Sequence, residues 1–349
     1  MAFRWMPEWL KQAPSGGPDG PGDGLEPGET LFDEAFLGQL RRLTVMPGQV
    51  RAEGIAGEHR SRRRGVSPEF ADFKRYSPGD DYRRIDWNIY ARLDGLFIRL
   101  SEVTAELGVH VLLDASESMQ WRGEAARPAK FTYARRVAGA LGYVAIWHFD
   151  RLTVTPFAEG PGHAFGPAQG RAQALPMLRA IESMRPHGGT ALGETLSRYL
   201  HAHRRPGVLI VISDFLTGEP EDLRGALREA RGRGWHVALV QVLDDAEVSA
   251  EAAAAWLAKD EREHSQGHGH GHGHGATPLM ELVDSESGEK VQLAAGGELA
   301  RRYGERVAAW LAGIEAVCAE EQATYLRLLT GWDFEDVTMR LLREREVIA

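Results

Sequence analysis

Five apolar runs that alternate with helical patterns constrain the fold of this chain more than any other feature. The runs are VHVLLD (109–114), LTVTPFAE (152–159), GVLIVISD (207–214), HVALVQVLD (236–244) and a weaker ATYLRLL (323–329). Near-continuous Val, Ile and Leu runs separated by amphipathic helices are typical of a parallel sheet covered on both faces. The sequence therefore predicts a doubly wound, mainly parallel α/β domain over residues 107–349. Its ligand site should lie beyond the carboxyl ends of the strands.

The first 106 residues have a different character. Residues 1–30 are rich in Pro, Gly and acidic side chains and are expected to form a disordered tail, because they have little apolar surface to bury. Residues 31–106 are dense in charged and aromatic side chains, and we expect an extension of loops and short strands there. Near its start a short helix is predicted from four apolar residues on one helical face, Phe32, Phe36, Leu37 and Leu40.

A Gly/His-rich insertion at about 262–278 interrupts the alternation of the α/β domain. Its alternate histidines point the same way in an extended segment, which would suit a transition metal. A solvated loop is the preferred interpretation, because no scaffold fixes the ligand geometry. The segment 279–293 that follows predicts a β-hairpin with its turn around Ser287 and Gly288.

The composition excludes several classes of protein. The 349 residues are 43% hydrophobic and 26% charged, which suits a globular protein, and the net charge of -9 argues against nucleic acid or an anionic membrane as the main partner. A basic cluster at 59–65 keeps nucleic-acid binding as a minor alternative. Cys318 is the one cysteine, which excludes an internal disulfide and fits a reducing compartment. With no apolar stretch of about 18 residues, we expect a cytoplasmic protein without a membrane span.

Oxygen-bearing side chains follow two of the predicted strands and open one helix. Asp114 ends the first run and is followed by Ser116 and Ser118, while Asp214 ends the third run. Thr190 follows two glycines at the start of a helical pattern. Because the carboxyl ends of parallel strands meet at one edge of a sheet, these five side chains are predicted to converge. Hydroxyl and carboxylate oxygens suit Mg²⁺ (or Mn²⁺), which predicts a metal site there.

Two other interpretations of these residues stay open. Asp114 and Ser116 are common helix-capping residues, but a cap leaves Ser118, Thr190 and Asp214 unexplained. A Mg²⁺-dependent hydrolase would need a general base. His187 precedes the two glycines and could approach the site, whereas His110 is expected to pack in the core and Glu117 to point away from the serines. The chain has no Gly-x-x-x-x-Gly-Lys-Ser/Thr loop for nucleotide hydrolysis, and we expect no catalytic residue.

The ordered set resembles the metal-ion-dependent adhesion site of von Willebrand factor A domains, which implies a Rossmann-like fold. The matching positions are Asp114, Ser116 and Ser118, then Thr190, then Asp214. That resemblance implies that the serines and the threonine would ligate directly and that the aspartates would act directly or through water. Upstream, EFADFKRYSPGDDYRRIDWNIYARLDGLFIRL (69–100) resembles the signature of the domain of unknown function 58 family. The resemblance covers roughly residues 35–245.

The resemblance to these families implies a function as well as a fold. It implies a non-enzymatic, Mg²⁺-dependent protein-binding module that takes an acidic side chain of a partner as a ligand of its ion. Family context implies work beside a MoxR-type AAA+ ATPase in the assembly or maturation of other proteins. Many members of the family carry N-terminal transmembrane helices, and this sequence shows no such segment, so a membrane setting is not carried over. The alternative remains a Mg²⁺-dependent hydrolase that uses the same site.

Overall fold

The chain divides into two units. Unit 1 comprises Met1–Val50 and Leu107–Ala349, and unit 2 comprises Arg51–Glu106. The computed structural model describes residues 31–46, 72–77, 85, 87–93, 95–100, 107–123, 127–216, 220–248, 279–283, 290–294, 297–335, 339–345 and 347–349. The expected disordered tail (1–30), the basic cluster (59–65) and the Gly/His-rich insertion (262–278) lie outside the described residues.

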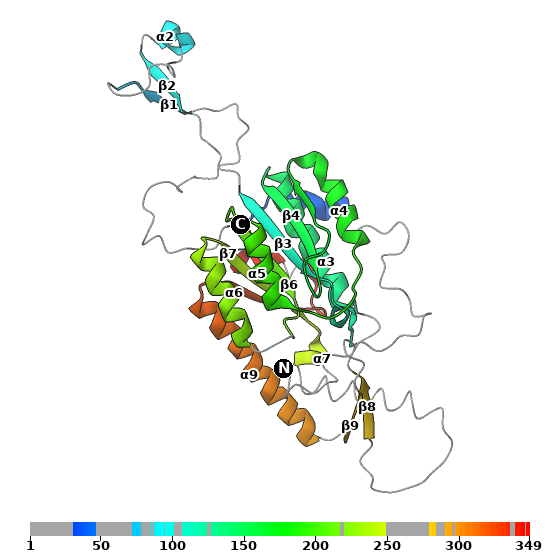
Figure 1. The fold of residues 1–349 in the computed structure, drawn as a ribbon. Helices are drawn as coiled ribbons and strands as arrows, with labels where there is room; N and C mark the ends of the chain where they lie inside the picture. Colours follow the sequence, from blue (N-terminus) through cyan, green and yellow to red (C-terminus); the bar gives the residue numbers. More distant parts are fainter. Residues whose placement is uncertain are drawn as a thin grey trace. The chain divides into compact units, whose positions relative to one another are not determined.

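A six-stranded sheet in the order β10-β7-β6-β3-β4-β5 forms the centre of unit 1 (Figure 1). All neighbouring strands are parallel except β5, which pairs antiparallel with β4. The prediction of a mainly parallel α/β fold is therefore confirmed. The edge strand β5 was not predicted, because its sequence FGPA carries no strand signal. The bounds are β3 Gly108–Asp114, β4 Arg151–Phe157, β5 Phe165–Ala168, β6 Val208–Ser213, β7 His236–Leu243 and β10 Thr324–Leu329.

Helices cover both faces of this sheet, and Figure 1 shows α5, α6 and α9 on one face and α3 and α4 on the other. Two separate hydrophobic clusters match this arrangement, one beneath each helical layer. Strand β3 contributes Val109, Val111 and Leu113 to one cluster and Leu112 to the other, as a strand buried on both faces must. The bounds are α3 Lys130–Trp147, α4 Ala174–Ser183, α5 Leu192–Ala202, α6 Pro220–Gly232, α7 Asp245–Val248 and α9 Gly297–Glu320.

The first described segment packs into unit 1, in contrast to the expected extension over 31–106. Helix α1 (Glu34–Leu40) is capped by Asp33, whose carboxylate accepts from the Phe36 amide at 2.7 Å. Phe36 and Leu40 are buried in the same cluster as α3. The following residues pair with the C-terminus through a Val45–Ile348 bridge, beside the last helix α10 (Met339–Glu344). Unit 1 is therefore built from chain on both sides of unit 2.

The predicted hairpin after the Gly/His-rich insertion is present. Strands β8 (Leu279–Val283) and β9 (Lys290–Ala294) pair antiparallel with Val283 opposite Lys290, and the predicted turn around Ser287 and Gly288 lies outside the described residues. Two short 3₁₀ helices complete unit 1, η3 (Glu117–Gln120) and η4 (Arg171–Gln173).

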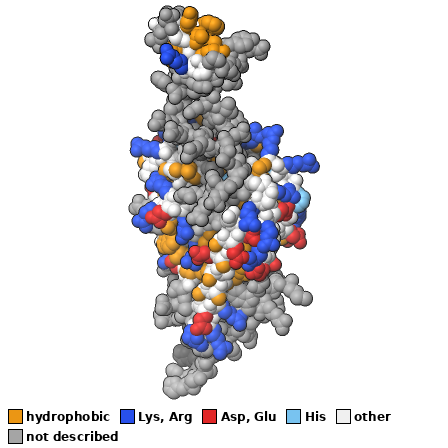
Figure 2. All heavy atoms as spheres, turned by 90° about the vertical axis from the view of Figure 1, so that its left-hand side faces the viewer, with side chains coloured by type: hydrophobic (Ala, Val, Ile, Leu, Met, Phe, Trp, Pro, Cys, Tyr) orange, Lys and Arg blue, Asp and Glu red, His pale blue; other side chains and the backbone are white. Residues whose placement is uncertain are grey.

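Unit 2 contains a two-stranded antiparallel sheet of β1 (Asp72–Arg75) and β2 (Phe97–Leu100). Short strands were expected here, but the helix α2 (Trp87–Leu93) between them was not. At seven residues, α2 is too short to show a helical repeat in the sequence. Trp87 is 65% exposed and meets Tyr90 edge to face, and Figure 2 shows exposed hydrophobic side chains on this unit.

Charged side chains of both signs are interleaved on the face of unit 1 that Figure 2 presents. Helices α6 and α9 supply several of them, and on α9 the exposed side chains of Arg301 and Glu305 lie 2.5 Å apart. Exposed pairs of this kind stabilise a fold only weakly. None of the helices in the described part of the chain is both long and apolar enough to cross a membrane.

Candidate metal centre

Asp114 is the last residue of β3, and its carboxylate is fully buried. One oxygen, Oδ1, accepts from the Ser116 amide at 2.9 Å, and Oδ2 accepts from the Ser213 hydroxyl at 2.5 Å. Ser213 ends the neighbouring strand β6. Because groups on two strand ends hold it, the carboxylate has a fixed orientation at the carboxyl edge of the sheet.

The two serines after β3 and the aspartate after β6 form a chain of oxygens. Ser116 Oγ lies 3.1 Å from Ser118 Oγ, and Ser118 Oγ donates to Asp214 Oδ2 at 3.2 Å. All of these side chains are buried. The structure therefore brings together four of the five side chains that the sequence predicts to converge.

The backbone after β6 is strained in a way that fixes Asp214. Phe215 is buried and adopts a left-handed conformation with φ of 53°, which is uncommon for a bulky residue. This turn lets the Leu216 amide donate to Asp214 Oδ1 at 2.9 Å. From β7, the Gln241 side chain donates to the Asp214 carbonyl oxygen at 2.7 Å. Both the carboxylate and the backbone of Asp214 are thereby held in place.

The loop that carries Thr190 lies against the loop after β3. The His187 amide donates to the Ala115 carbonyl at 2.7 Å, and the Glu117 amide donates to the Gly188 carbonyl at 2.9 Å. Gly188 has φ of 67°, which a glycine adopts without strain. Thr190 Oγ1 is buried and has no hydrogen-bond partner among the described residues. A buried hydroxyl without a partner is unfavourable, so this oxygen is available for a ligand.

Sequence reasoning missed two charged residues next to these oxygens. The Lys130 ammonium donates to Asp214 Oδ2 and to Glu247 Oε1, both at 2.7 Å. All three side chains are buried. Lys130 is the first residue of α3, a position at which a lysine is ordinarily expected to be exposed. Glu247 lies in the short helix α7 after β7. A lysine at the first position of a helix whose remaining residues are mostly apolar was the available signal.

The buried charges around the oxygens do not balance. Asp214 and Glu247 share the ammonium of Lys130, and the buried carboxylate of Asp114 is close enough to Asp214 for their like charges to interact. Burial, together with the like charge of Asp214, raises the pKa of Asp114. Burial also raises the pKa of Glu247, to about 7, although Lys130 acts in the opposite direction. For Lys130, burial lowers the pKa, but attraction by Asp214 and Glu247 outweighs it and the net shift is upward. A further cation would relieve this excess of negative charge.

The separation of the oxygens fits a small divalent cation. Two adjacent ligands of an octahedral ion at about 2.1 Å lie about 3.0 Å from each other, and the chain of Ser116, Ser118 and Asp214 has spacings of 3.1 and 3.2 Å. These residues and Thr190 are the ones that would hold Mg²⁺ or Mn²⁺. In the described part of the chain, no three His, Cys, Asp or Glu side chains gather closely enough to hold a metal ion. A site here therefore depends on hydroxyls.

His187 was the histidine nearest to the motif in sequence. Its side chain is exposed, and its Nδ1 lies 3.1 Å from the Arg185 carbonyl oxygen. The ring is thus engaged with its own loop.

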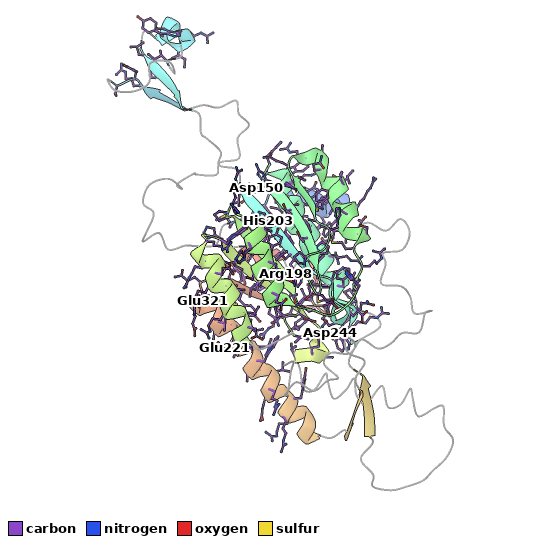
Figure 3. The ribbon with its side chains drawn as sticks, in the orientation of Figure 1. Asp150, Arg198, His203, Glu221, Asp244 and Glu321 are labelled. Atoms are coloured by element: carbon purple, nitrogen blue, oxygen red, sulfur yellow. The ribbon has the colours of Figure 1, made fainter. Side chains whose placement is uncertain are left out.

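A histidine cluster occupies the opposite end of the sheet, which Figure 3 marks by His203 and Asp150, whereas Asp244 marks the end near the oxygens. His110 on β3 lies 2.8 Å from the Tyr199 hydroxyl and packs edge to face on Trp235. Burial lowers the pKa of His110 to about 4, and the neighbouring side chains of His203 and Arg151 lower it further. This fits the interpretation of His110 as a packed residue of the fold.

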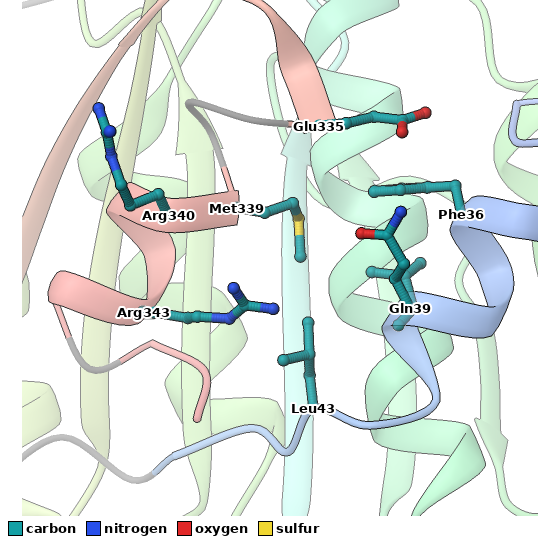
Figure 4. Close-up of a pocket in the computed structure, with 8 residues that line it drawn as sticks. Phe36, Gln39, Leu43, Glu335, Met339, Arg340 and Arg343 are labelled. Atoms are coloured by element: carbon teal, nitrogen blue, oxygen red, sulfur yellow. The ribbon is translucent and has the colours of Figure 1, made fainter.

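A small cleft lies between α1 and α10 (Figure 4). Its volume is about 130 Å³, well below the roughly 300–1,000 Å³ of sites for drug-sized ligands. It shares no residue with the oxygen cluster. The lining residues are Phe36, Gln39, Leu40, Leu43, Glu335, Met339, Arg340 and Arg343.

Comparison with known proteins places this chain in a family. The family described as "Protein of unknown function DUF58" matches residues 72–263, more than half of the chain. The chain belongs to the DUF58 family. The matched region includes all five predicted oxygen donors together with Lys130 and Glu247.

Similar proteins include uncharacterized proteins of Mycobacterium tuberculosis and Mycobacterium bovis. Each is 28% identical to this DUF58 protein over 223 residues, which is 62% of this chain and 68% of the relative. Solved structures show weaker likenesses. Proximal thread matrix protein 1 of the mussel byssus has a TM-score of 0.30 at 18% identity, covering 39% of this chain and 35% of that one. Manganese-loaded Plasmodium vivax TRAP protein has a TM-score of 0.29 at 13% identity, covering 39% and 57%. These likenesses add nothing to the reasoning from the site itself.

Proposed function

We propose that this DUF58 protein is a non-enzymatic, Mg²⁺-dependent protein-binding module. Asp114, Ser116, Ser118, Thr190 and Asp214 hold Mg²⁺ (or Mn²⁺), and the ion takes an acidic side chain of a protein partner as a further ligand. The observation that carries the proposal is the chain of Ser116, Ser118 and Asp214 oxygens, spaced 3.1 and 3.2 Å apart within a buried group rich in negative charge.

The type of donor explains why such an ion would bind a partner. An ion held largely by neutral hydroxyls keeps much of its positive charge, so it attracts a carboxylate strongly. The carboxylates of Asp114 and Asp214 are each held by backbone amides, which fixes the direction of the remaining position. The protein contributes pre-organised oxygens, and the partner supplies the last ligand.

The identity of the partner follows from the family resemblance rather than from the geometry. We propose that the partner system includes a MoxR-type AAA+ ATPase in the cytoplasm, and that the pair acts in the assembly or maturation of other proteins. On this proposal the DUF58 protein recognises the client protein or the ATPase, and ATP hydrolysis by the ATPase drives the assembly or maturation step.

The test is a capture experiment with the full chain on a resin. Native lysate is passed over it with Mg²⁺ and with EDTA, and the bound proteins are compared for the wild type and Asp114→Asn. The proposal expects a set of partners, including an AAA+ ATPase, that is lost with EDTA and lost with Asp114→Asn.

Asp150→Asn is the matched control for that variant. Asp150 is also a buried aspartate, but it lies at the opposite end of the sheet (Figure 3). Its substitution should leave the Mg²⁺-dependent partners unchanged. A partner set that ignores both EDTA and Asp114→Asn would refute the metal-bridged function.

A further inference from the structure

Lys130 is an unusual residue to find beside a cation site. Its side chain has no exposed surface, and it is the first residue of α3. The amino end of a helix carries a partial positive charge, so a lysine there is unfavourable unless carboxylates compensate it. The residue before it, Ala129, gives no side-chain cap to the helix. Lys130 is therefore placed for its contacts with Asp214 and Glu247, because its position in the helix is unfavourable in itself.

The two hydrogen bonds of the ammonium connect the oxygen cluster to α7. Asp214 Oδ2 accepts from Lys130 Nζ at 2.7 Å and from Ser118 Oγ at 3.2 Å. The same oxygen thus faces both the fixed ammonium and the hydroxyls that would hold an ion. On the other side, Glu247 Oε1 accepts from Nζ at 2.7 Å. Asp214 Oδ2 is therefore the single atom that connects Lys130 to the candidate metal position.

Glu247 is itself held firmly. Its Oε2 accepts from the Asp244 amide at 2.7 Å, and its carbonyl oxygen accepts from the Tyr303 hydroxyl of α9. This anchorage keeps a negative charge on the far side of the ammonium from Asp214. Glu247 therefore shares the positive charge of Lys130 and reduces the part that acts on the oxygen cluster.

We propose that the positive charge of Lys130 sets the metal affinity of the oxygen cluster, and that the carboxylate of Glu247 partly offsets this charge. The inference rests on the proposed function, since it concerns the same ion. The ammonium neutralises Asp214 when no metal is bound, so the fold does not require the ion. It also repels an incoming divalent ion and competes for Asp214 Oδ2, so the ion is held weakly until a partner carboxylate adds its charge. Metal and partner then bind together.

The test measures metal binding by the full-length protein, separately from partner capture. Mn²⁺ is titrated and its free concentration is followed by electron paramagnetic resonance, and Mg²⁺ is added as a competitor. Lys130→Met should bind Mn²⁺ at least about tenfold more tightly than the wild type, because one positive charge near the ion is gone. Glu247→Gln should bind at least about threefold more weakly, because the ammonium loses its second carboxylate. The double variant should lie between the two single variants.

Arg127→Met is the control for loss of charge. Arg127 pairs with Asp245, the residue that opens α7, in the same region. Its substitution removes the same positive charge and should change the Mn²⁺ affinity less than Lys130→Met does. A change as large as that of Lys130→Met would mean that the effect is general electrostatics, which would overturn the specific role of Lys130.

Thermal unfolding gives a second measurement on the same variants. Lys130→Met should lose stability in EDTA, because Asp214 and Glu247 are left without their cation, and Mg²⁺ should restore it. If Lys130→Met does not fold, Glu247→Gln still tests the inference, because it must bind Mn²⁺ more weakly than the wild type. Equal or weaker Mn²⁺ binding by Lys130→Met, or unchanged binding by Glu247→Gln, would overturn this inference. Absence of Mn²⁺ binding by every protein including the wild type would instead overturn the proposed function.

Discussion

Thr190 gives the sharpest test of which atoms hold the ion. Its Oγ1 is buried without a hydrogen-bond partner among the described residues, and an unsatisfied buried polar group costs about 1–3 kcal/mol. Thr190→Val replaces the hydroxyl with a methyl group of similar size. In EDTA the variant should therefore be more stable than the wild type by about 1 kcal/mol, or about 2–4 °C in Tm for a domain of this size.

With Mg²⁺ this stability advantage of the variant should disappear. At a Mg²⁺ concentration one hundred times the wild-type Kd, the wild type gains about 2.7 kcal/mol. Loss of one ligand that weakens binding about tenfold reduces the gain to about 1.4 kcal/mol at the same concentration. Differential scanning fluorimetry across a Mg²⁺ titration measures both effects. A Thr190→Val variant with the full wild-type Mg²⁺ shift would refute the role of this hydroxyl as a ligand.

Thr195 is the matched control for this substitution. It lies in α5, is fully buried, and its Oγ1 also has no hydrogen-bond partner among the described residues. Thr195→Val should raise stability by a similar amount in EDTA, but its Mg²⁺ shift should equal that of the wild type. If both variants lost the Mg²⁺ shift equally, the effect would come from packing around α5.

Three further predictions concern the rest of unit 1. In the folded state the pKa of His110 is lowered from 6.5 to about 4. As the pH falls, the His110 side chain is therefore protonated in the unfolded chain before it is protonated in the folded protein. The stability present above pH 6.5 is lost toward pH 4 by up to ~3 kcal/mol. His110→Gln should flatten this part of the pH profile in urea unfolding, and a profile parallel to the wild type would contradict it. Gly207→Ala should destabilise by about 1–3 kcal/mol in the same assay, since a Cβ there collides with the Gly108 carbonyl oxygen; wild-type stability would contradict this. Cys318 is buried with its pKa raised to about 12, so a thiol reagent should label it only when the protein unfolds, and rapid labelling of the native protein would be the contrary result.

The sequence predicts the central sheet because its strands are buried on both faces. Such strands need apolar side chains at nearly every position, and the runs at β3, β6 and β7 meet this need. The meeting of Asp114, Ser116, Ser118 and Asp214 follows from the same fact, since parallel strands place their carboxyl ends together. The parts of the site that lie at strand ends were therefore predictable.

The ion pairs of Lys130 were not predictable in this way. Its partners lie 84 and 117 residues away in the chain, and contacts over such distances leave no local pattern. The edge strand β5 and the helix α2 were not predicted for a related reason. Each is short and lacks the composition of its class, so tertiary packing decides its structure rather than local preference.

The placement of unit 2 within the chain has a mechanical consequence. Unit 2 joins unit 1 at two places, after the segment that pairs with the C-terminus and just before β3. A pulling force on unit 2 therefore enters unit 1 along β3, which is hydrogen-bonded to β4 on one edge and to β6 on the other. Asp114 stands at the far end of that loaded strand, so the strand that anchors unit 2 under tension is the strand that presents the oxygens.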